Sequence, residues 1–255
     1  MNERLTRLWA TKTKNDEWWS SFVTAPLAIA ANYLLVDLTW LTPNRITALS
    51  FVAAVIGALC IVVGGTSNFV IAAALIHVSH ILDCMDGQMA RYRKTSSAVG
   101  SYFDRLTDQA QVILWFGAVG YAAYTSSLDV TPLFLAFIGT AFYGLRGYAK
   151  YVAVHVEMTL NSEYLAKISA EKVITKKAGI AFTWRENFNW FLKEQHKIFN
   201  FDEGVFVFML SLALLLNNLD LMLWVFALSQ FFYGSYRAVQ HGWRINSTPS
   251  HPIEK

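Results

Sequence analysis

Charged side chains are scarce in this chain. Only 15% of its 255 residues are Asp, Glu, Lys or Arg, whereas 55% are hydrophobic and 15% are aromatic. This composition argues against a soluble protein and is typical of one that crosses a membrane several times. The formal net charge is only +3, so bulk charge gives no reason to expect a nucleic-acid partner.

Cysteine is almost absent, and no cleavable signal peptide is evident. Cys60 and Cys84 both fall in apolar stretches, so they provide no disulfide framework and indicate no redox role. Cys84 is best interpreted as a small buried side chain. The first seventeen residues are polar and charged, unlike the apolar centre of a secretory leader.

Six apolar segments are separated by turn signals, and each is near the 20 residues needed to cross the hydrocarbon. The sequence therefore predicts an all-α integral membrane protein whose six transmembrane helices form one domain over residues 43–240. The predicted spans cover about 44–63, 69–91, 98–123, 131–155, 203–217 and 220–240.

An N-terminal arm, residues 1–42, precedes the first span. Its stretch from Trp18 to Trp40 is apolar but is interrupted by Pro26, Asn32 and Asp37. This pattern predicts an amphipathic helix lying in the membrane interface, with its tryptophans at headgroup depth. A seventh spanning helix is the alternative.

Lysine and arginine are absent from three of the loops, 64–68, 124–130 and 217–219. All 21 basic residues lie in the arm, at the opposite ends of the spans, in the segment 156–202, or in the tail 241–255. The positive-inside rule then places both termini in the cytoplasm. An even number of spans follows, which favours six over seven, and we expect a multi-pass protein of the inner membrane of a prokaryotic cell.

The segment 156–202 departs from a compact six-helix plan. It contains seven lysines and arginines with apolar and aromatic residues among them. This mixture predicts one or two amphipathic helices on the anionic cytoplasmic leaflet. The segment is either a membrane-surface linker or a lid, a partner surface or an acceptor-recognition element.

Four aspartates fall where the chain is expected to lie in the membrane. Asp83 and Asp86 are three residues apart, and Asp104 and Asp108 are four apart, so each pair projects from one face of a helix. The polar segment 92–99 predicts a hairpin that brings the pairs together. Each carboxylate costs about 2.5–3.5 kcal/mol near a bilayer centre, and a divalent cation or protonation makes their clustering tolerable. Oxygen-only ligation favours Mg²⁺ or Mn²⁺.

These aspartates belong to a longer pattern, D-x2-D-G-x2-A-R-x8-G-x3-D-x3-D. Its eight fixed positions are filled by Asp83, Asp86, Gly87, Ala90, Arg91, Gly100, Asp104 and Asp108. The pattern covers a tenth of the chain and closely resembles the signature of the class I CDP-alcohol phosphotransferases. The resemblance implies transfer of a phosphatidyl or substituted phosphoryl group from a CDP-linked donor to an alcohol acceptor, with release of CMP, in phospholipid biosynthesis. One of the two substrates would be a lipid, and a homodimer is expected by analogy.

The same resemblance implies a role for each residue. Asp83, Asp86 and Asp104 are the expected metal ligands. Asp108 is the expected base for the acceptor hydroxyl, and it also contacts the metal. The expected donor-binding residues are Asn44, Thr47, Asp83, Gly87, Ala90, Arg91 and Gly100. The alternative is helix packing for Gly87 and Ala90 and helix capping for Asn44 and Thr47. For Arg91 it is anchoring at the basic side of the membrane.

Two further groups of polar residues lie within the spans. Arg146 and Lys150 are four residues apart in the fourth span. Charges within a span are functional candidates, here for binding a phosphate on the acceptor, and snorkelling to lipid headgroups is the alternative. His77 and His80 precede Asp83 by two turns and one turn. Their offset from the carboxylate face predicts packing or hydrogen bonding rather than metal ligation.

Two other functions remain open. A membrane prenyltransferase also binds a pyrophosphate through Mg²⁺ and Asp-rich helices, but it would release pyrophosphate instead of CMP. A divalent-cation transporter would carry its carboxylates near the bilayer midplane. The carboxylates here lie near one face, and the neighbouring basic residues Arg91, Arg93 and Lys94 would repel cations.

Overall fold

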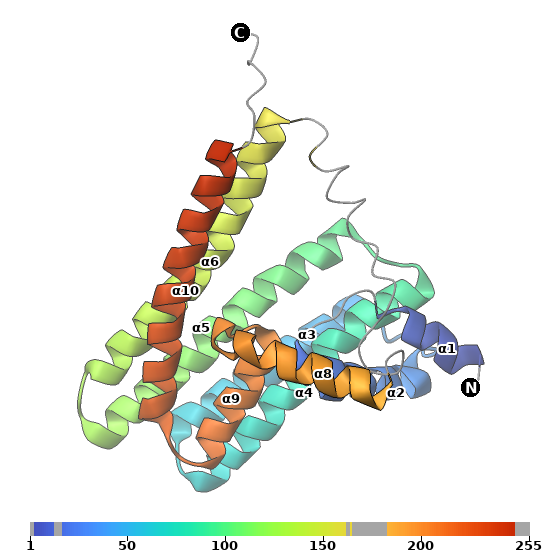
Figure 1. Cartoon of the computed structure of the whole chain (residues 1–255). Coiled ribbons are helices and arrows are strands. Elements are labelled where there is room, and N and C mark those ends of the chain that lie inside the picture. Colours follow the sequence, from blue (N-terminus) through green and yellow to red (C-terminus); the bar gives the residue numbers. More distant parts are fainter. Residues whose placement is uncertain (1–2, 13–16, 162–163, 165–182, 248–255) are drawn as a thin grey trace.

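The structure is a computed structural model that describes residues 3–12, 17–161, 164 and 183–247. Helices make up nearly all of these residues, and no strand occurs among them (Figure 1). The predicted all-α class is therefore confirmed. The elements are α1 (Glu3–Ala10), a π-helical turn η1 (Ser20–Thr24), α2 (Ala25–Leu35), α3 (Pro43–Val63), α4 (Thr66–Arg93), α5 (Ala98–Ser127), α6 (Thr131–Leu160), α8 (Trp184–Glu194), a 3₁₀ turn η2 (Gln195–Asn200), α9 (Glu203–Leu215) and α10 (Leu219–Ser247).

The six apolar segments predicted from the sequence coincide with α3, α4, α5, α6, α9 and α10. The largest differences lie at the C-terminal ends, where α5 continues to Ser127, α6 to Leu160 and α10 to Ser247. An apolar run marks the part of a helix that suits a membrane, whereas the helix itself continues until a turn residue or a cap stops it. These helices therefore extend past their apolar segments.

The connection between α4 and α5 is the hairpin predicted at 92–99. Lys94 adopts the left-handed conformation, with φ 57°, and ends α4. Ser97 caps α5, because its Oγ accepts a hydrogen bond from the Gly100 amide at 3.0 Å. The C-terminal end of α4 and the N-terminal end of α5 are thus held close together.

The helices α6 and α10 lie side by side along one edge of the molecule (Figure 1). A glycine allows their close approach, because a Cβ atom at Gly139 would overlap the ring of Phe226. Arg244 of α10 donates two hydrogen bonds, of 2.7 and 2.9 Å, to the buried carboxylate of Glu157 in α6. This bidentate pair joins the two helices near their C-terminal ends.

The larger of two apolar cores joins α3, α4, α5, α6, α9 and α10. At its centre the rings of Phe116 and Phe226 stack with their centroids 3.6 Å apart. The indole nitrogen of Trp115 donates a hydrogen bond to the carbonyl oxygen of Ala54 at 3.0 Å, which satisfies the one polar atom of a buried ring. The core therefore fixes α3, α5 and α10 relative to one another.

The outer surface of the bundle is also apolar. On α10 the exposed side chains Leu221, Trp224, Leu228 and Phe232 recur at helical spacing and form an outward stripe. In water a large apolar face of this kind would be a site of association, whereas in a bilayer it contacts lipid tails.

Two described helices, α3 and α4, are long and apolar enough to cross a membrane. The segments 184–200 and 203–215 meet at an angle of 74°, and if this bent pair counts as one span the number rises to three. The structure therefore supports a protein with membrane-spanning helices, while the count of six stays a prediction.

The N-terminal arm packs against α4. The helix predicted from Trp18 ends at Leu35, five residues before Trp40. Asn32 of α2 is fully buried and donates a hydrogen bond to the carbonyl oxygen of Met85 at 3.0 Å. The arm is thus attached to the helix that carries the first aspartate pair, and its place in the membrane interface stays a prediction.

Part of the basic segment 156–202 lies outside the described residues, which omit 162–163 and 165–182. The described part contains α8, one of the amphipathic helices expected there. The ring of Trp190 in α8 lies 5.3 Å from that of Phe22 in the arm. This aromatic contact joins α8 to the arm, and α8 lies across the front of the molecule in Figure 1.

The close approach of α6 and α10 makes Gly139 a test of the packing. We expect Gly139→Ala to lower the stability by about 1–3 kcal/mol, since the new methyl group forces the Phe226 ring to move. Gly117→Ala is the matched control, because no atom lies within 4 Å of a Cβ at that position. Thermal unfolding of both variants in detergent is the measurement, and equal midpoints would contradict the packing described here.

Candidate metal centre and substrate cavities

Three of the four motif aspartates converge near the hairpin between α4 and α5. Asp83, Asp104 and Asp108 each offer one carboxylate oxygen, and these oxygens all lie within 4.8 Å of one another. The helix α3 packs against both α4 and α5, and it holds them so that the carboxylates face a shared space. Oxygens at this spacing can ligate one hard divalent cation.

Asp86 lies beside this group and is held by α3. The hydroxyl of Thr47 donates a hydrogen bond to Oδ2 of Asp86, whose side chain is buried. The structure thus brings three predicted ligands together and orients the fourth from a neighbouring helix. A hydrogen-bonded carboxylate of this kind is a common way to fix a metal ligand.

The electrostatics of the cluster favour a bound cation. Oδ1 of Asp83 is buried and has no hydrogen-bond partner among the described residues. Leaving such an acceptor unsatisfied costs about 1–3 kcal/mol, and more for a charged group. Nearby carboxylates add repulsion. The donor set consists of carboxylate oxygens, so these residues fit Mg²⁺ or Mn²⁺.

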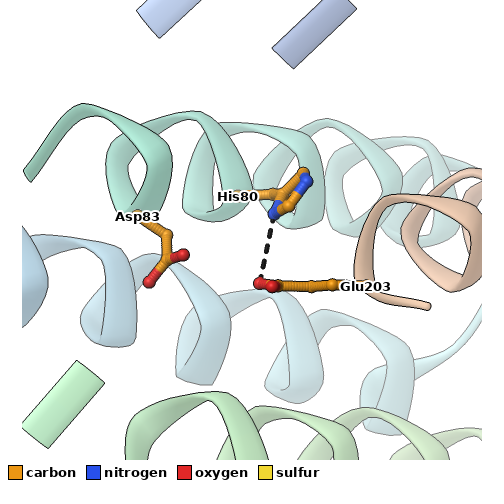
Figure 2. Close-up of side chains that lie close together, drawn as sticks. All are labelled: His80, Asp83 and Glu203. Carbon is orange, nitrogen blue, oxygen red and sulfur yellow. Dashed lines mark ion pairs between the residues drawn. The ribbon is translucent and has the colours of Figure 1, made fainter. Parts of the chain in front are cut away.

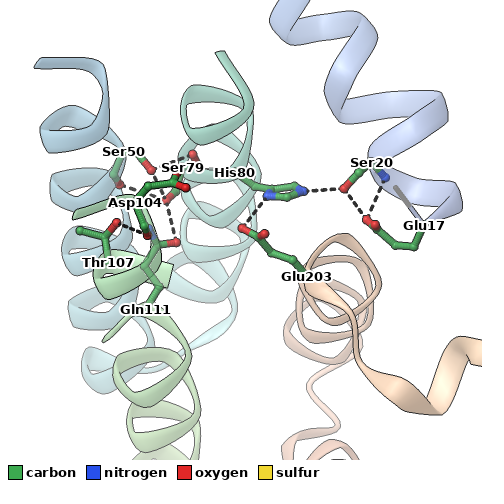
Figure 3. Close-up of polar contacts among 9 residues, drawn as sticks. All are labelled: Glu17, Ser20, Ser50, Ser79, His80, Asp104, Thr107, Gln111 and Glu203. Carbon is green, nitrogen blue, oxygen red and sulfur yellow. Dashed lines mark hydrogen bonds and ion pairs between the residues drawn. The ribbon is translucent and has the colours of Figure 1, made fainter. Parts of the chain in front are cut away.

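A buried network of hydrogen bonds links α3, α4 and α5 one turn away from the carboxylates (Figure 3). Ser50 of α3 donates a hydrogen bond to the carbonyl oxygen of Ser79 in α4 at 2.9 Å. The hydroxyl of Ser79 lies 3.4 Å from Oε1 of Gln111 in α5. Ser79 precedes Asp83 by one turn and Gln111 follows Asp108 by one turn, so this hydrogen-bond network sets the spacing of the two aspartates.

A cavity of about 290 Å³ is lined by the start of α3 and by the hairpin. Asp86 and Asp104 form its wall toward the carboxylate cluster. A Cβ atom at Gly87 would lie 3.1 Å from Nη1 of Arg91, so glycine leaves room for the guanidinium in this wall. The cavity gathers every predicted donor-binding residue except Asp83, namely Asn44, Thr47, Gly87, Ala90, Arg91 and Gly100.

A second cavity, of about 490 Å³, is lined by all four motif aspartates and by three further carboxylates. Asp202 and Glu203 come from the start of α9, and Glu17 comes from the N-terminal arm. Figure 2 shows Glu203 reaching from α9 toward His80 and Asp83 of α4. Nδ1 of His80 lies 3.3 Å from Oε1 of Glu203. This cavity is strongly acidic.

A third cavity, of about 590 Å³, has the opposite charge. It meets the second cavity at Asp108 and Asp202, which line both. Nε2 of His241 is buried at its wall and has no hydrogen-bond partner among the described residues. An anionic group is the ligand that suits such a wall. Its basic side chains are Arg105, Arg146, Lys150, Arg237 and His241.

The two residues predicted to bind the acceptor, Arg146 and Lys150, both line the third cavity. The guanidinium of Arg146 lies 4.5 Å from the ring centroid of Tyr143, and Tyr143 is part of the same wall. The structure thus places both basic residues in a cavity that reaches Asp108, an arrangement that snorkelling to headgroups does not require.

Two residues of the acidic cavity are not among the predicted metal ligands. In the sequence, Glu203 resembles any acidic residue in the first turn of a helix, where a negative charge stabilises the helix N-terminus. His80 hydrogen-bonds with Ser20 at 2.9 Å, which agrees with the predicted packing or hydrogen bonding. It also offers a ligand atom within 4.8 Å of those of Asp83 and Glu203. The predicted offset of His80 from the carboxylates is wrong, because residues three apart share one helix face.

Comparison with known proteins identifies relatives of this chain. Residues 40–233 match the profile of the CDP-alcohol phosphatidyltransferase family. The bifunctional IPC transferase and DIPP synthase of Thermococcus kodakarensis is 28% identical over 131 residues, which cover 51% of this chain and 29% of that protein. The CDP-diacylglycerol–serine O-phosphatidyltransferase of Helicobacter pylori strain J99 is 34% identical over 103 residues, which cover 38% of this chain and 42% of that protein. The chain spans less than half the length of these relatives.

The contact between Thr47 and Asp86 predicts a change in metal affinity. We expect Thr47→Val to weaken Mn²⁺ binding about 10-fold or more, because the carboxylate loses the group that orients it. Thr47→Ser keeps the hydroxyl and is expected to retain the affinity. Binding is followed by the loss of the free Mn²⁺ signal in electron paramagnetic resonance. Equal affinities of the valine and serine variants would argue against this role of Thr47.

Proposed function

Because the chain belongs to the CDP-alcohol phosphatidyltransferase family, we propose that it transfers a phosphatidyl or other substituted phosphoryl group from a CDP-linked donor to an alcohol, with release of CMP, in phospholipid biosynthesis. The observation that carries this proposal is the convergence of Asp83, Asp104 and Asp108 beside a cavity lined by Asn44 and Arg91. A diphosphate ester in that cavity would lie next to the carboxylates.

The metal site consists of Asp83, Asp86, Asp104 and Asp108, and it would take Mg²⁺ or Mn²⁺. When bound, the metal neutralises charge on the diphosphate and on the departing phosphate. The side chain of Thr47 keeps one ligand, Asp86, in place. The metal site would thus position the donor, and the bound metal would lower the repulsion between the phosphates of the donor and the carboxylates.

Asp108 is the proposed base. It lies one turn beyond Asp104 on α5 and lines both the acidic and the basic cavity. An acceptor hydroxyl at this junction gives its proton to the Asp108 carboxylate. The acceptor oxygen then forms a bond to the phosphorus that carries the alcohol of the donor. The diphosphate bond breaks, and CMP leaves with the electron pair.

The donor subsite is the cavity beside α3 and the hairpin. Asn44 and Thr47 at the start of α3 face Gly87, Ala90 and Arg91 of α4 across it. The small side chains leave space for a flat base, and the guanidinium provides forked donors for a phosphate. Gly100 is part of the same wall, and a Cβ there would lie 3.1 Å from Oγ of Ser97, which caps α5.

The acceptor subsite is the basic cavity. Arg146 and Lys150 line it together with Arg105, Arg237 and His241. An acceptor that carries a phosphate or a carboxylate would bind there and present its hydroxyl to the carboxylates at the junction. The name of one relative specifies serine and CDP-diacylglycerol, which belong to these acceptor and donor classes.

The proposed placement is six spans with both termini in the cytoplasm of a prokaryotic cell, in a homodimer. The helices α5, α6 and α10 have 30, 30 and 29 residues, which is sufficient length for a bilayer. The helix α9 has 13 residues and covers only about 20 Å at 1.5 Å per residue. Because α9 is this short, the part of the membrane before Glu203 is left for the acidic cavity, which Asp202 and Glu203 line.

The first test of this function is CMP release. Purified protein with Mg²⁺ or Mn²⁺ is supplied with CDP-diacylglycerol or CDP-aminoalcohol donors and a panel of alcohols, and nucleotide and lipid products are identified by mass. We expect Asp108→Asn to lower turnover by about 10²–10⁴-fold, the usual contribution of a positioned base.

Several outcomes would oppose the proposal. Pyrophosphate release from a prenyl donor would favour a prenyltransferase, and metal flux into liposomes would favour a transporter. Absence of CMP with every donor and acceptor would contradict the function, and normal turnover of Asp108→Asn would contradict the role of that residue.

The basic cavity predicts a separate effect on the acceptor. We expect Lys150→Gln to raise KM for an anionic acceptor about 10-fold, the loss of about 1.4 kcal/mol of binding, with little change in kcat or in KM for the donor. Lys193→Gln on α8 is the matched control, because Lys193 does not line this cavity. Steady-state kinetics with both substrates varied measures the effect, and a larger change in donor KM would place the donor in this cavity.

A further inference from the structure

A second group of ligand atoms lies beside the motif and includes a nitrogen. His80 and Asp83 of α4 and Glu203 of α9 each offer one ligand atom, and the three atoms lie within 4.8 Å of one another (Figure 2). We propose that His80, Asp83 and Glu203 bind a transition-metal ion such as Mn²⁺, in a site next to that of the four motif aspartates. The two sites share Asp83.

A chain of hydrogen bonds indicates that Nε2 of His80 carries a proton (Figure 3). Ser20 donates its hydroxyl hydrogen to Oε1 of Glu17, and its amide donates to the same oxygen at 3.1 Å. Toward His80 the Ser20 oxygen therefore acts as the acceptor, so Nε2 of His80, 2.9 Å away, is the donor. Nδ1 is then the nitrogen that can offer a lone pair to a metal.

This arrangement is the one that supports a histidine ligand. Metal-bound histidines commonly donate their other N–H group to an acceptor, which fixes the tautomer and the ring orientation. Here the acceptor is Ser20, which Glu17 holds in turn. Both residues lie in the N-terminal arm, so the arm supplies the outer support of a site whose ligands come from α4 and α9.

The atoms that face Nδ1 require a positive charge between them. Nδ1 of His80 lies 3.3 Å from Oε1 of Glu203, and a lone pair opposite a carboxylate oxygen is repulsive without a proton or a metal. With bonds of about 2.0–2.2 Å, neighbouring ligand atoms around a metal lie about 3.0–3.5 Å apart. The observed separation matches that range.

The charge of the acidic cavity supports an additional cation. Seven carboxylates line it, and the only lysine and arginine among its lining residues are Lys12 and Arg91. Four carboxylates belong to the motif and are explained by its metal. The other three add negative charge next to a site that has to accept an anionic diphosphate. They are Glu17, Asp202 and Glu203.

The ligand set indicates which metals would bind. Mg²⁺ and Ca²⁺ take oxygen ligands, whereas imidazole nitrogen suits transition metals. A site with one imidazole and two carboxylates therefore discriminates against Mg²⁺. The motif site, with carboxylates alone, does not. This inference shares Asp83 with the proposed function but does not depend on the reaction.

Competition between Mn²⁺ and Mg²⁺ tests the site in the full chain. Purified protein is stripped of metal, loaded with Mn²⁺ and dialysed against excess Mg²⁺. We expect wild type to retain about one Mn²⁺ more than His80→Gln and Glu203→Gln. The matched controls are His77→Gln, since His77 packs on Trp19 with ring centroids 5.4 Å apart, and Glu194→Gln, since Glu194 pairs with Lys197 outside the cavity. Both controls are expected to retain Mn²⁺ as wild type does.

Nitrogen coupling to the retained Mn²⁺, measured by pulsed electron paramagnetic resonance, provides a test on the folded wild type itself. We expect the coupling in wild type and His77→Gln and its loss in His80→Gln. A wild type without nitrogen coupling, or equal Mn²⁺ retention in all variants, would overturn the proposal and leave His80 and Glu203 as an ion pair. CMP release by the same preparations is measured as well. It tests the proposed function separately, because the reaction does not depend on a nitrogen ligand to Mn²⁺.

Discussion

Carboxylates crowded within an apolar helical bundle impose the main constraint on this structure. Asp83, Asp104 and Asp108 place oxygens within 4.8 Å of one another, and one oxygen of Asp83 is buried without a hydrogen-bond partner among the described residues. Such a cluster requires a bound cation or the protonation of some of its carboxylates. The surrounding helices are arranged to hold it, since Ser50, Ser79 and Gln111 link α3, α4 and α5 one turn away.

The cavities around this cluster differ in charge, and that difference separates the proposed roles. The donor cavity brings Arg91 next to small side chains, and the third cavity has a basic wall that includes Arg146 and Lys150. Asp108 lies where the acidic and basic cavities meet. In the proposed reaction, a base at this junction would reach an acceptor held by basic residues while the metal ligands hold the donor.

The N-terminal arm is part of the site although it precedes the residues that match the family, 40–233. Asn32 joins α2 to α4, and the Nε atom of Arg91 donates to the carbonyl oxygen of Thr11 at 2.7 Å. Ser20 orients His80. The arm therefore closes one side of the acidic cavity, and the proposed second metal site depends on it.

The sequence alone predicts the helical class, the six apolar segments, the hairpin and the four aspartates, because these follow from local periodicity, turn residues and fixed spacing. It also identified Arg146 and Lys150 as candidates. Only the tertiary structure brought Glu203 beside His80, since these residues are distant in the chain and each has an ordinary local role. The charge of each cavity was likewise decided by packing, because helices far apart in sequence contribute its walls.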